Sequence, residues 1–250
     1  MRRVSVLLFS ASLLVATGCG LKRYEQRMDL SLEKLKYEKR LADNLAPPPT
    51  DPRFQELGIY VRPPKGLELT KVFQLGDVPP GLYDVEASFI EPQKQQMHIV
   101  ARNKQAAKKA VPKGQAAPPK AARNDFNADV LQGMLGPVYG VTEEVQLTKL
   151  KDETKKAPPG VGAGNKFKRL LFQVATGATT SDVQVYIYKQ DPYDVAFVFV
   201  FPTGDANKAA SKIELTLESF AVGERARRIF SGGSADEEGE GVETGGGVAF

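Results

Sequence analysis

His98 is the only histidine in this chain of 250 residues, so any hydrolytic triad would have to use it as the general base. The chain lacks the G-x-S-x-G pattern that places a nucleophilic serine on a sharp turn. In the alternating segment around Met97 and Ile99, His98 points to the opposite face, together with Val100 and Arg102. We therefore expect a histidine at the surface or on a sheet face, and not a catalytic base.

A glycine-rich run, Gly160-Val-Gly-Ala-Gly-Asn-Lys166, has some features of a phosphate-binding loop. The P-loop requires G-x-x-x-x-G-K, so that backbone amides surround the phosphate, followed by a Ser or Thr that holds magnesium. Here Asn165 occupies the place of the last glycine, Phe167 follows the lysine, and no apolar strand precedes the run. The pattern predicts a hairpin loop and no nucleotide site.

Acidic residues also fail to form a recognisable site in the sequence. Glu143 and Glu144 are adjacent, so on a strand they point to opposite faces, although a glycosidase pair that meets only in the fold stays open. The acidic residues near the C-terminus lack the D-x-D-x-D-G spacing of a calcium loop. These residues are Asp236, Glu237, Glu238, Glu240 and Glu243. One cysteine and one histidine exclude an internal disulfide and a zinc site built from several such residues. We expect no metal and no cofactor.

Residues 104–123 carry a formal charge of +6 with no acid, and nothing in them can build a core. We expect a disordered insertion that is either a soluble linker or a docking segment for an anionic polymer, such as lipopolysaccharide or teichoic-type material. The segment has no aromatic side chain for base stacking, and the net charge of the whole chain is only +4, so nucleic acid is not an expected partner. The candidate docking residues are Lys104, Lys108, Lys109, Lys113, Lys120 and Arg123.

The single cysteine, Cys19, follows a short apolar stretch from Val4 to Ala16 that begins after Arg2 and Arg3. This stretch is too short to cross a bilayer of about 30 Å and suits the h-region of a signal peptide. The sequence Leu14-Val-Ala-Thr-Gly-Cys19 resembles a lipobox, with Ala16 where a leucine is more usual. The resemblance implies cleavage after residue 18 and acylation of Cys19, which removes two arginines and lowers the formal charge from +4 to +2.

The resemblance also implies a location. In lipoproteins of two-membrane bacteria an aspartate after the cysteine commonly retains the protein in the inner membrane, and Gly20 stands there instead. We expect an outer-membrane lipoprotein that faces the periplasm. The alternative is an ordinary secretory signal that leaves Cys19 as an incidental thiol.

Residues 19–52 are expected to link the lipid to a folded domain. Apolar residues between Leu21 and Leu45 recur mostly every three or four positions, which predicts a helix that is either a solvated tether or a short coiled-coil seam. The proline-rich segment 46–52 ends it and predicts a stiff spacer.

Residues 53–230 are expected to form one α+β domain, followed by a disordered acidic tail at 231–250. Alternating patterns predict strands near residues 58–61, 83–89, 97–101, 141–150, 167–176 and 183–187. Val195 to Phe201 is apolar on both faces and predicts a central, covered strand, with its three phenylalanines in the core.

Two apolar stripes at helical spacing complete the domain. One runs from Phe126 to Leu135 and is expected to stop at Gly136-Pro137, and the other runs from Ala206 to Ala221. Asp205 is the expected N-cap of the second helix and Gly223 its C′ residue, while residues 151–166 are expected to be a polar loop. The fold class is therefore α+β, an antiparallel sheet of about five to seven strands covered by helices.

The order of these elements resembles the PsbP-like fold over residues 54–222. The segment Leu215-Thr-Leu-Glu-Ser-Phe220 is similar to the terminal helix of that family, and Pro64-Lys-Gly-Leu67 to its early turn, with Leu67 where an aromatic residue is usual. The resemblance implies a binding or accessory module, often attached to a larger membrane assembly, and brings no catalytic residues to this chain.

Taken together, the sequence predicts a non-enzymatic lipoprotein that binds another envelope component, either a protein or an anionic polymer. Two alternatives remain open. An envelope hydrolase would use carboxylates that converge on the sheet, whereas a small-ligand carrier would have an apolar cavity between sheet and helix.

Overall fold

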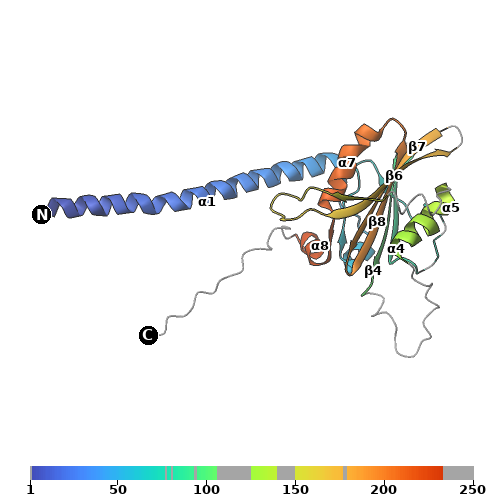
Figure 1. Ribbon diagram of the computed structural model, residues 1–250, viewed down its shortest axis with the longest axis horizontal. Helices are drawn as coiled ribbons and strands as arrows, with labels where there is room; N and C mark the ends of the chain where they lie inside the picture. The colour runs from blue at the N-terminus through green and yellow to red at the C-terminus, as the bar shows by residue number, and fades with distance from the viewer. Residues whose placement is uncertain are drawn as a thin grey trace, which may run out of the picture.

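The computed structural model describes residues 2–76, 78–79, 81–92, 95–105, 125–139, 150–176 and 179–232. A long N-terminal helix, α1 (Arg2–Asn44), projects from a domain of strands and shorter helices (Figure 1). Residues 106–123 of the expected insertion, residues 141–149 of the strand expected at 141–150 and tail residues 233–250 lie outside the described residues.

In the part of the chain that the structure describes, one antiparallel sheet of seven strands forms the centre of the domain, so the predicted α+β fold is confirmed. Its strands, in spatial order, are β2 (Glu68–Leu69), β3 (Val85–Glu91), β4 (Gln95–Asn103), β8 (Tyr193–Pro202), β7 (Thr179–Gln190), β6 (Lys166–Thr176) and β5 (Lys151–Thr154). The strands predicted near residues 83–89 and 97–101 are confirmed as β3 and β4, which pair antiparallel with Ala87 opposite Ile99. The polar loop expected at 151–166 is wrong in its first part, because residues 151–154 pair with β6 as an edge strand.

Strand β8 lies in the middle of the sheet and is buried on both faces, as its sequence predicts. Successive side chains of a strand point to opposite faces. Phe197 and Phe199 accordingly pack into one core cluster, and Ala196 and Val198 pack into a second cluster across the sheet. Two apolar cores of this kind require a cover on each face of the sheet.

The first core is covered mainly by α7 (Ala206–Ser219), whose inward residues Ala209, Ile213 and Leu217 recur every four positions. Around it lie α2 (Pro52–Leu57), α8 (Gly223–Phe230) and a two-stranded sheet of β1 (Ile59–Tyr60) and β9 (Ala221–Val222). The strand predicted at 58–61 therefore exists but pairs outside the main sheet.

Three short helical segments pack against the second core: α4 (Phe126–Ala128), the π-helix η1 (Asp129–Leu135) and α5 (Gly136–Tyr139). The predicted apolar face is confirmed, since Phe126, Val130 and Leu135 are fully buried. The predicted stop at Gly136-Pro137 is wrong because a further helical segment begins there. The backbone stays right-handed helical at Gly136 (φ −55°, ψ −55°), so η1 runs into α5 without a break.

Helix α1 has an exposed part and a packed part. Residues 22–29 are exposed throughout, and the apolar side chains of Tyr24 and Leu35 are 62% and 67% exposed. Tyr37, Leu41 and Leu45, spaced by four, are instead buried in a small cluster with Leu215 of α7.

The proline-rich segment after α1 also lies against the domain. Leu45 forms a β-bridge with Pro64, the Ala46 N–H donates to the Pro63 carbonyl at 2.8 Å, and Pro49 is buried. The packed part of the chain therefore begins inside α1, before residue 53.

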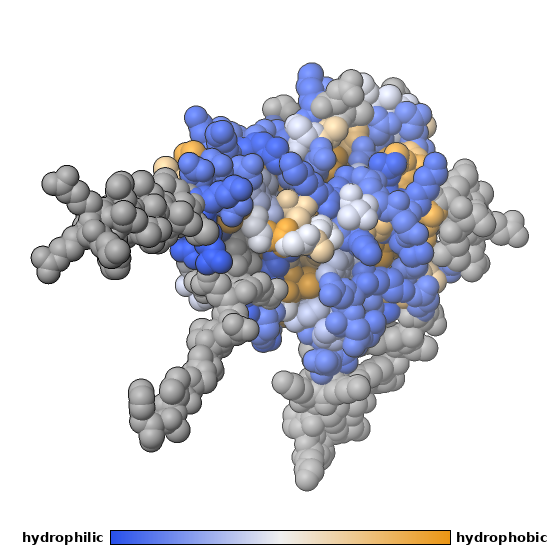
Figure 2. Space-filling view, turned by 60° about the vertical axis from the view of Figure 1, so that its left-hand side comes forward, coloured by the Kyte–Doolittle hydropathy of each residue, from blue (hydrophilic) through white to orange (hydrophobic). Residues whose placement is uncertain are grey.

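The face shown in Figure 2 is mainly hydrophilic, and its hydrophobic residues gather in small separate patches. Within the described residues, none of the helices is both long and apolar enough to cross a membrane.

Candidate functional site

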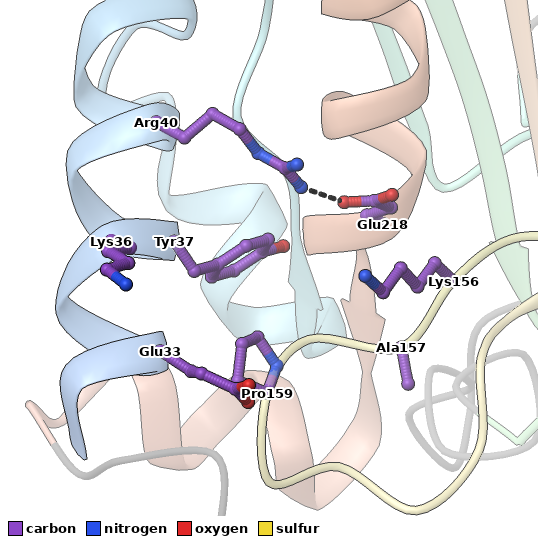
Figure 3. Close-up of a pocket in the computed structure, with 8 residues that line it drawn as sticks. All are labelled: Glu33, Lys36, Tyr37, Arg40, Lys156, Ala157, Pro159 and Glu218. Atoms are coloured by element: carbon purple, nitrogen blue, oxygen red, sulfur yellow. Dashed lines mark hydrogen bonds and ion pairs between the residues drawn. The ribbon is translucent and has the colours of Figure 1, made fainter. Parts of the chain in front are cut away.

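A cleft of about 300 Å³ lies where α1 meets the domain (Figure 3). One wall is α1, the opposite wall is the last turn of α7, and the connection between β5 and β6 closes one end. Its lining residues are Glu33, Lys36, Tyr37, Arg40, Lys156, Ala157, Pro159 and Glu218.

Glu218 is the most deeply placed charge in the cleft, with a side chain only 4% exposed. The apolar face of α7 directs neighbouring Leu217 into the core, and Glu218 projects beside it toward α1. Arg40 donates a hydrogen bond from Nη2 to Glu218 Oε2 at 2.8 Å. Burial raises the pKa of the Glu218 carboxyl, while the charges of Arg40 and Lys156 act in the opposite direction.

Tyr37 contributes an apolar ring and a hydroxyl group to the cleft. The Arg40 guanidinium carbon lies 5.5 Å from the ring centroid, within the range of a cation–π contact. The phenol oxygen is buried and forms no hydrogen bond with any described residue, and it points toward the space between Glu218 and Lys156 (Figure 3). Burial raises the pKa of Tyr37 well above its usual value, so this group stays a donor.

The glycine-rich run shapes the end of the cleft, and the prediction that it is a hairpin loop fits its position between β5 and β6. A Cβ added at Gly164 would lie 1.7 Å from the Lys155 carbonyl oxygen, so the two arms of the loop can approach only at a glycine. Asn165 Nδ2 donates to the carbonyls of Leu217 and Phe220 at 3.2 and 2.7 Å. The loop is thereby tied to the C-terminal end of α7, and it presents Lys156 to the cleft.

A second cleft, of about 400 Å³, lies at the start of α7, but its polar groups are already paired. Lys208 forms an ion pair with Asp205, Gln95 donates to Glu91, and Lys212 donates to a backbone carbonyl. Asp205 is the N-cap residue of α7, as predicted, but its carboxylate binds Lys208 and accepts no hydrogen bond from a backbone N–H of the helix. Gly223 is not the C′ residue of α7, since it begins α8.

His98 lies on a sheet face, one of the two positions expected, and is 1% exposed. Ser88 Oγ and His98 Nδ1 are 2.8 Å apart, and Gln96 Oε1 lies 3.1 Å from Nε2. Burial lowers the pKa of His98 to about 4. A neutral, buried ring of this kind stabilises the sheet through its contacts with Ser88 and Gln96, and it is shielded from a substrate.

Two carboxylates do converge at one end of the sheet, which is the feature that the hydrolase alternative requires. Asp194 and Asp129 are 0% and 7% exposed and both accept hydrogen bonds from Arg102, at 2.9 and 3.1 Å. The guanidinium carbon also lies 4.8 Å from the Phe126 ring centroid. Both carboxylates are thus buried and paired with Arg102, and they are not exposed to solvent as a substrate-binding pair would be.

Of the sequence-predicted site residues, the structure describes Lys104 and Cys19, and neither lines the cleft. Lys104 forms ion pairs with Asp191 and Asp194, at 3.5 and 3.4 Å, at the base of the insertion. Cys19 lies within α1. The rest of the predicted docking set lies outside the described residues, namely Lys108, Lys109, Lys113, Lys120 and Arg123, and so does the pair Glu143 and Glu144.

Sequence reasoning missed the cleft residues. The spacing of Tyr37, Leu41 and Leu45 does indicate a packed stripe on α1. Nothing in the sequence indicates that this stripe lies against α7. Among the residues that the structure describes, no cluster of three or more His, Cys, Asp or Glu could hold a metal ion.

No family model matches the chain, and no curated protein matches its sequence. Among solved structures, the chain is similar to cyanobacterial PsbP from Synechocystis sp. PCC 6803, at 12% identity and a TM-score of 0.41, over 72% of this chain and 93% of that one. It is also similar to the Ran-binding protein Mog1p of Saccharomyces cerevisiae, at 12% identity and a TM-score of 0.32, over 66% of this chain and 90% of that one. One of these neighbours is thus a PsbP protein, the family whose order of elements the sequence resembles.

Proposed function

We propose that this chain is an exported lipoprotein in which an acylated Cys19 anchors a binding module to a membrane of the cell envelope. Helix α1 holds the domain at a set distance from the lipid, and the domain binds another envelope component. A small-residue lipobox before Cys19 and the basic residues at the start of the chain support the anchor.

The observation that carries the proposal is the continuity of α1 from the anchor into the packed domain. Cys19 and Tyr37 lie on the same helix, 18 residues apart, which corresponds to about 27 Å at 1.5 Å per residue. Tyr37, Leu41 and Leu45 then fix the helix to α7. A helix docked in this way transmits the position of the anchor to the domain, which a flexible linker of the same length would not do.

A binding role is favoured over catalysis by the chemistry of the candidate cleft. Its side chains supply hydrogen-bond donors and one paired carboxylate, which suits recognition of a ligand. With Gly20 after the cysteine, we place the protein in the outer membrane, facing the periplasm. The basic segment 104–123 would add electrostatic attraction to an anionic polymer.

The test compares the wild-type chain with Cys19→Ala in the same bacterium. Metabolic labelling with a fatty acid, followed by mass spectrometry of the mature N-terminus, should show acyl chains on wild-type Cys19 only. Fractionation should leave the wild type in the outer membrane and move the variant to the soluble fraction. An unacylated wild-type N-terminus, or a variant that stays in the membrane, would refute the anchor.

Capture of partners tests the binding role separately. The wild type, solubilised in detergent, should retain a reproducible envelope component, and the purified domain should bind that component again in isolation. Cys19→Ala should bind the same component in solution, because its domain is unchanged. If neither form retains a component under any of these conditions, the binding role is wrong even where acylation is observed.

A further inference from the structure

We propose that the cleft between α1, α7 and the β5–β6 connection binds a small soluble ligand through a carboxylate or phosphate group. This inference rests on the proposed function, since it names the chemical class that the binding domain accepts. The ligand group would sit between Tyr37, Arg40 and Lys156, at the point where these side chains converge in Figure 3.

The strongest support is the hydroxyl group of Tyr37. The residue is only 9% exposed, and its phenol oxygen has no hydrogen-bond partner among the described residues. A buried polar group without a partner is unfavourable, and native proteins rarely keep one without a reason. The hydroxyl is directed into the cleft, where an oxyanion would accept its proton in a hydrogen bond.

Two cations complete the set of donors. Lys156 lies near enough to Glu218 to influence its pKa, but forms no ion pair with any described residue. Arg40 uses Nη2 for Glu218, and its side chain is still 50% exposed, so its remaining N–H groups can reach a ligand. A guanidinium and an ammonium group beside a phenol are the donors that carboxylates and phosphates favour.

The charge of the cleft favours an anion over a cation. Its lining has three basic residues, Lys36, Arg40 and Lys156, against Glu33 and Glu218. Arg40 already balances Glu218 through their 2.8 Å contact. With that pair set aside, Lys36 and Lys156 stand against Glu33 alone, so the cleft keeps a net positive charge. A ligand oxyanion beside Lys156 and the Tyr37 hydroxyl would satisfy both groups at once.

The test is isothermal titration calorimetry on the full mature chain with two probes, inorganic phosphate and succinate, at constant ionic strength. A saturable heat is expected for at least one probe, and the probe that binds identifies the ligand group as phosphate or carboxylate. Tyr37→Phe and Lys156→Gln should each weaken binding about tenfold, the loss expected for one hydrogen bond to a charged group. Lys151→Gln, on the exposed edge strand β5, is the matched control and should bind like the wild type.

Thermal unfolding separates loss of the site from loss of the fold. Tyr37→Phe should unfold at the same temperature as the wild type or higher, because it removes the unpaired hydroxyl and keeps the ring in its cluster. Cys19→Ala should bind the probe normally, so a failure of membrane anchoring leaves this result unchanged. The inference is overturned if neither probe gives a saturable heat, or if Tyr37→Phe and Lys156→Gln bind as well as the wild type.

Discussion

The hydrogen bonds around His98 determine which ring nitrogen carries the proton. The Gln74 N–H donates to Ser88 Oγ at 2.9 Å, so the Ser88 hydroxyl directs its own proton to His98 Nδ1. The remaining ring proton is then on Nε2, and this N–H donates to Gln96 Oε1. A second proton, on Nδ1, would face the Ser88 proton, so this network holds the neutral ring that burial already favours.

The stability of the fold should depend on pH through His98. The pKa of this histidine is about 4 in the folded chain and about 6.5 when unfolded. Between these values the unfolded chain binds a proton that the folded chain does not, so the free energy of unfolding falls as the pH falls through this window, by about 3 kcal/mol at most. Urea unfolding of the wild type and His98→Asn from about pH 7 to about pH 4.5 measures the difference.

The NMR signal of the chain's single histidine gives an independent reading of this prediction. Its ring protons should keep the chemical shifts of the neutral form until the pH is well below 6, with a midpoint near the folded pKa. A midpoint at the ordinary value of about 6.5 would mean that the ring is open to solvent.

Two glycines of the same loop provide a matched pair of substitutions. Gly164→Ala places a Cβ against the Lys155 carbonyl, whereas a Cβ at Gly162 has no atom within 4 Å. Gly164→Ala should lower the free energy of unfolding by about 3 kcal/mol, and Gly162→Ala should change it by less than about 0.5 kcal/mol. Chemical denaturation of both variants makes the comparison, and equal effects would mean that the close approach at Gly164 can relax.

At the scale of elements, prediction succeeded where a periodic pattern was strong. Strand β8 was predicted from a run that is apolar on both faces, and the inward face of α7 from a spacing of four residues. Strand β5 was missed because Lys151 to Thr154 contains no apolar residue, and its pairing with β6 alone makes it a strand. Helix α8 was missed because it is short and begins with Gly223. It contains three arginines, and Ala226 is its one fully buried residue, so no apolar face is visible in the sequence.

The C-terminal end of α7 depends on a contact from a distant element. Asn165 donates to two carbonyls there, in a partly buried position, whereas Asn44 donates to one carbonyl of α1 in an exposed position. We expect Asn165→Ala to lower the free energy of unfolding by about 1–2 kcal/mol. Asn44→Ala should lower it by less than about 0.5 kcal/mol, as measured by urea unfolding. Equal losses would show that the Asn165 bonds add nothing beyond an exposed contact.

At the scale of the molecule, the candidate site joins segments that are far apart in the sequence. Arg40, Lys156 and Glu218 come from three elements, and no spacing rule connects them. The sequence could indicate that α1 has a packed stripe, but the partner Leu215 is known only from the fold. The signal for a lipid anchor, in contrast, lies in consecutive residues. Cys19 could therefore be proposed as the acylated residue from the six residues that end with it.

The arrangement of anchor, helix and domain predicts how the protein can be released from a membrane. A sequence-specific protease site inserted between Met28 and Asp29, in the exposed part of α1, should be cut readily and should free the whole domain into solution. The same site placed between Leu45 and Ala46 should resist cleavage, because Leu45 is 1% exposed and the neighbouring backbone is hydrogen-bonded to Pro63. Immunoblots of membrane and soluble fractions follow both variants over time. A domain that is cut at residue 28 and still sediments with the membrane would reveal a second attachment besides Cys19, and the helix would then not be its sole link to the lipid.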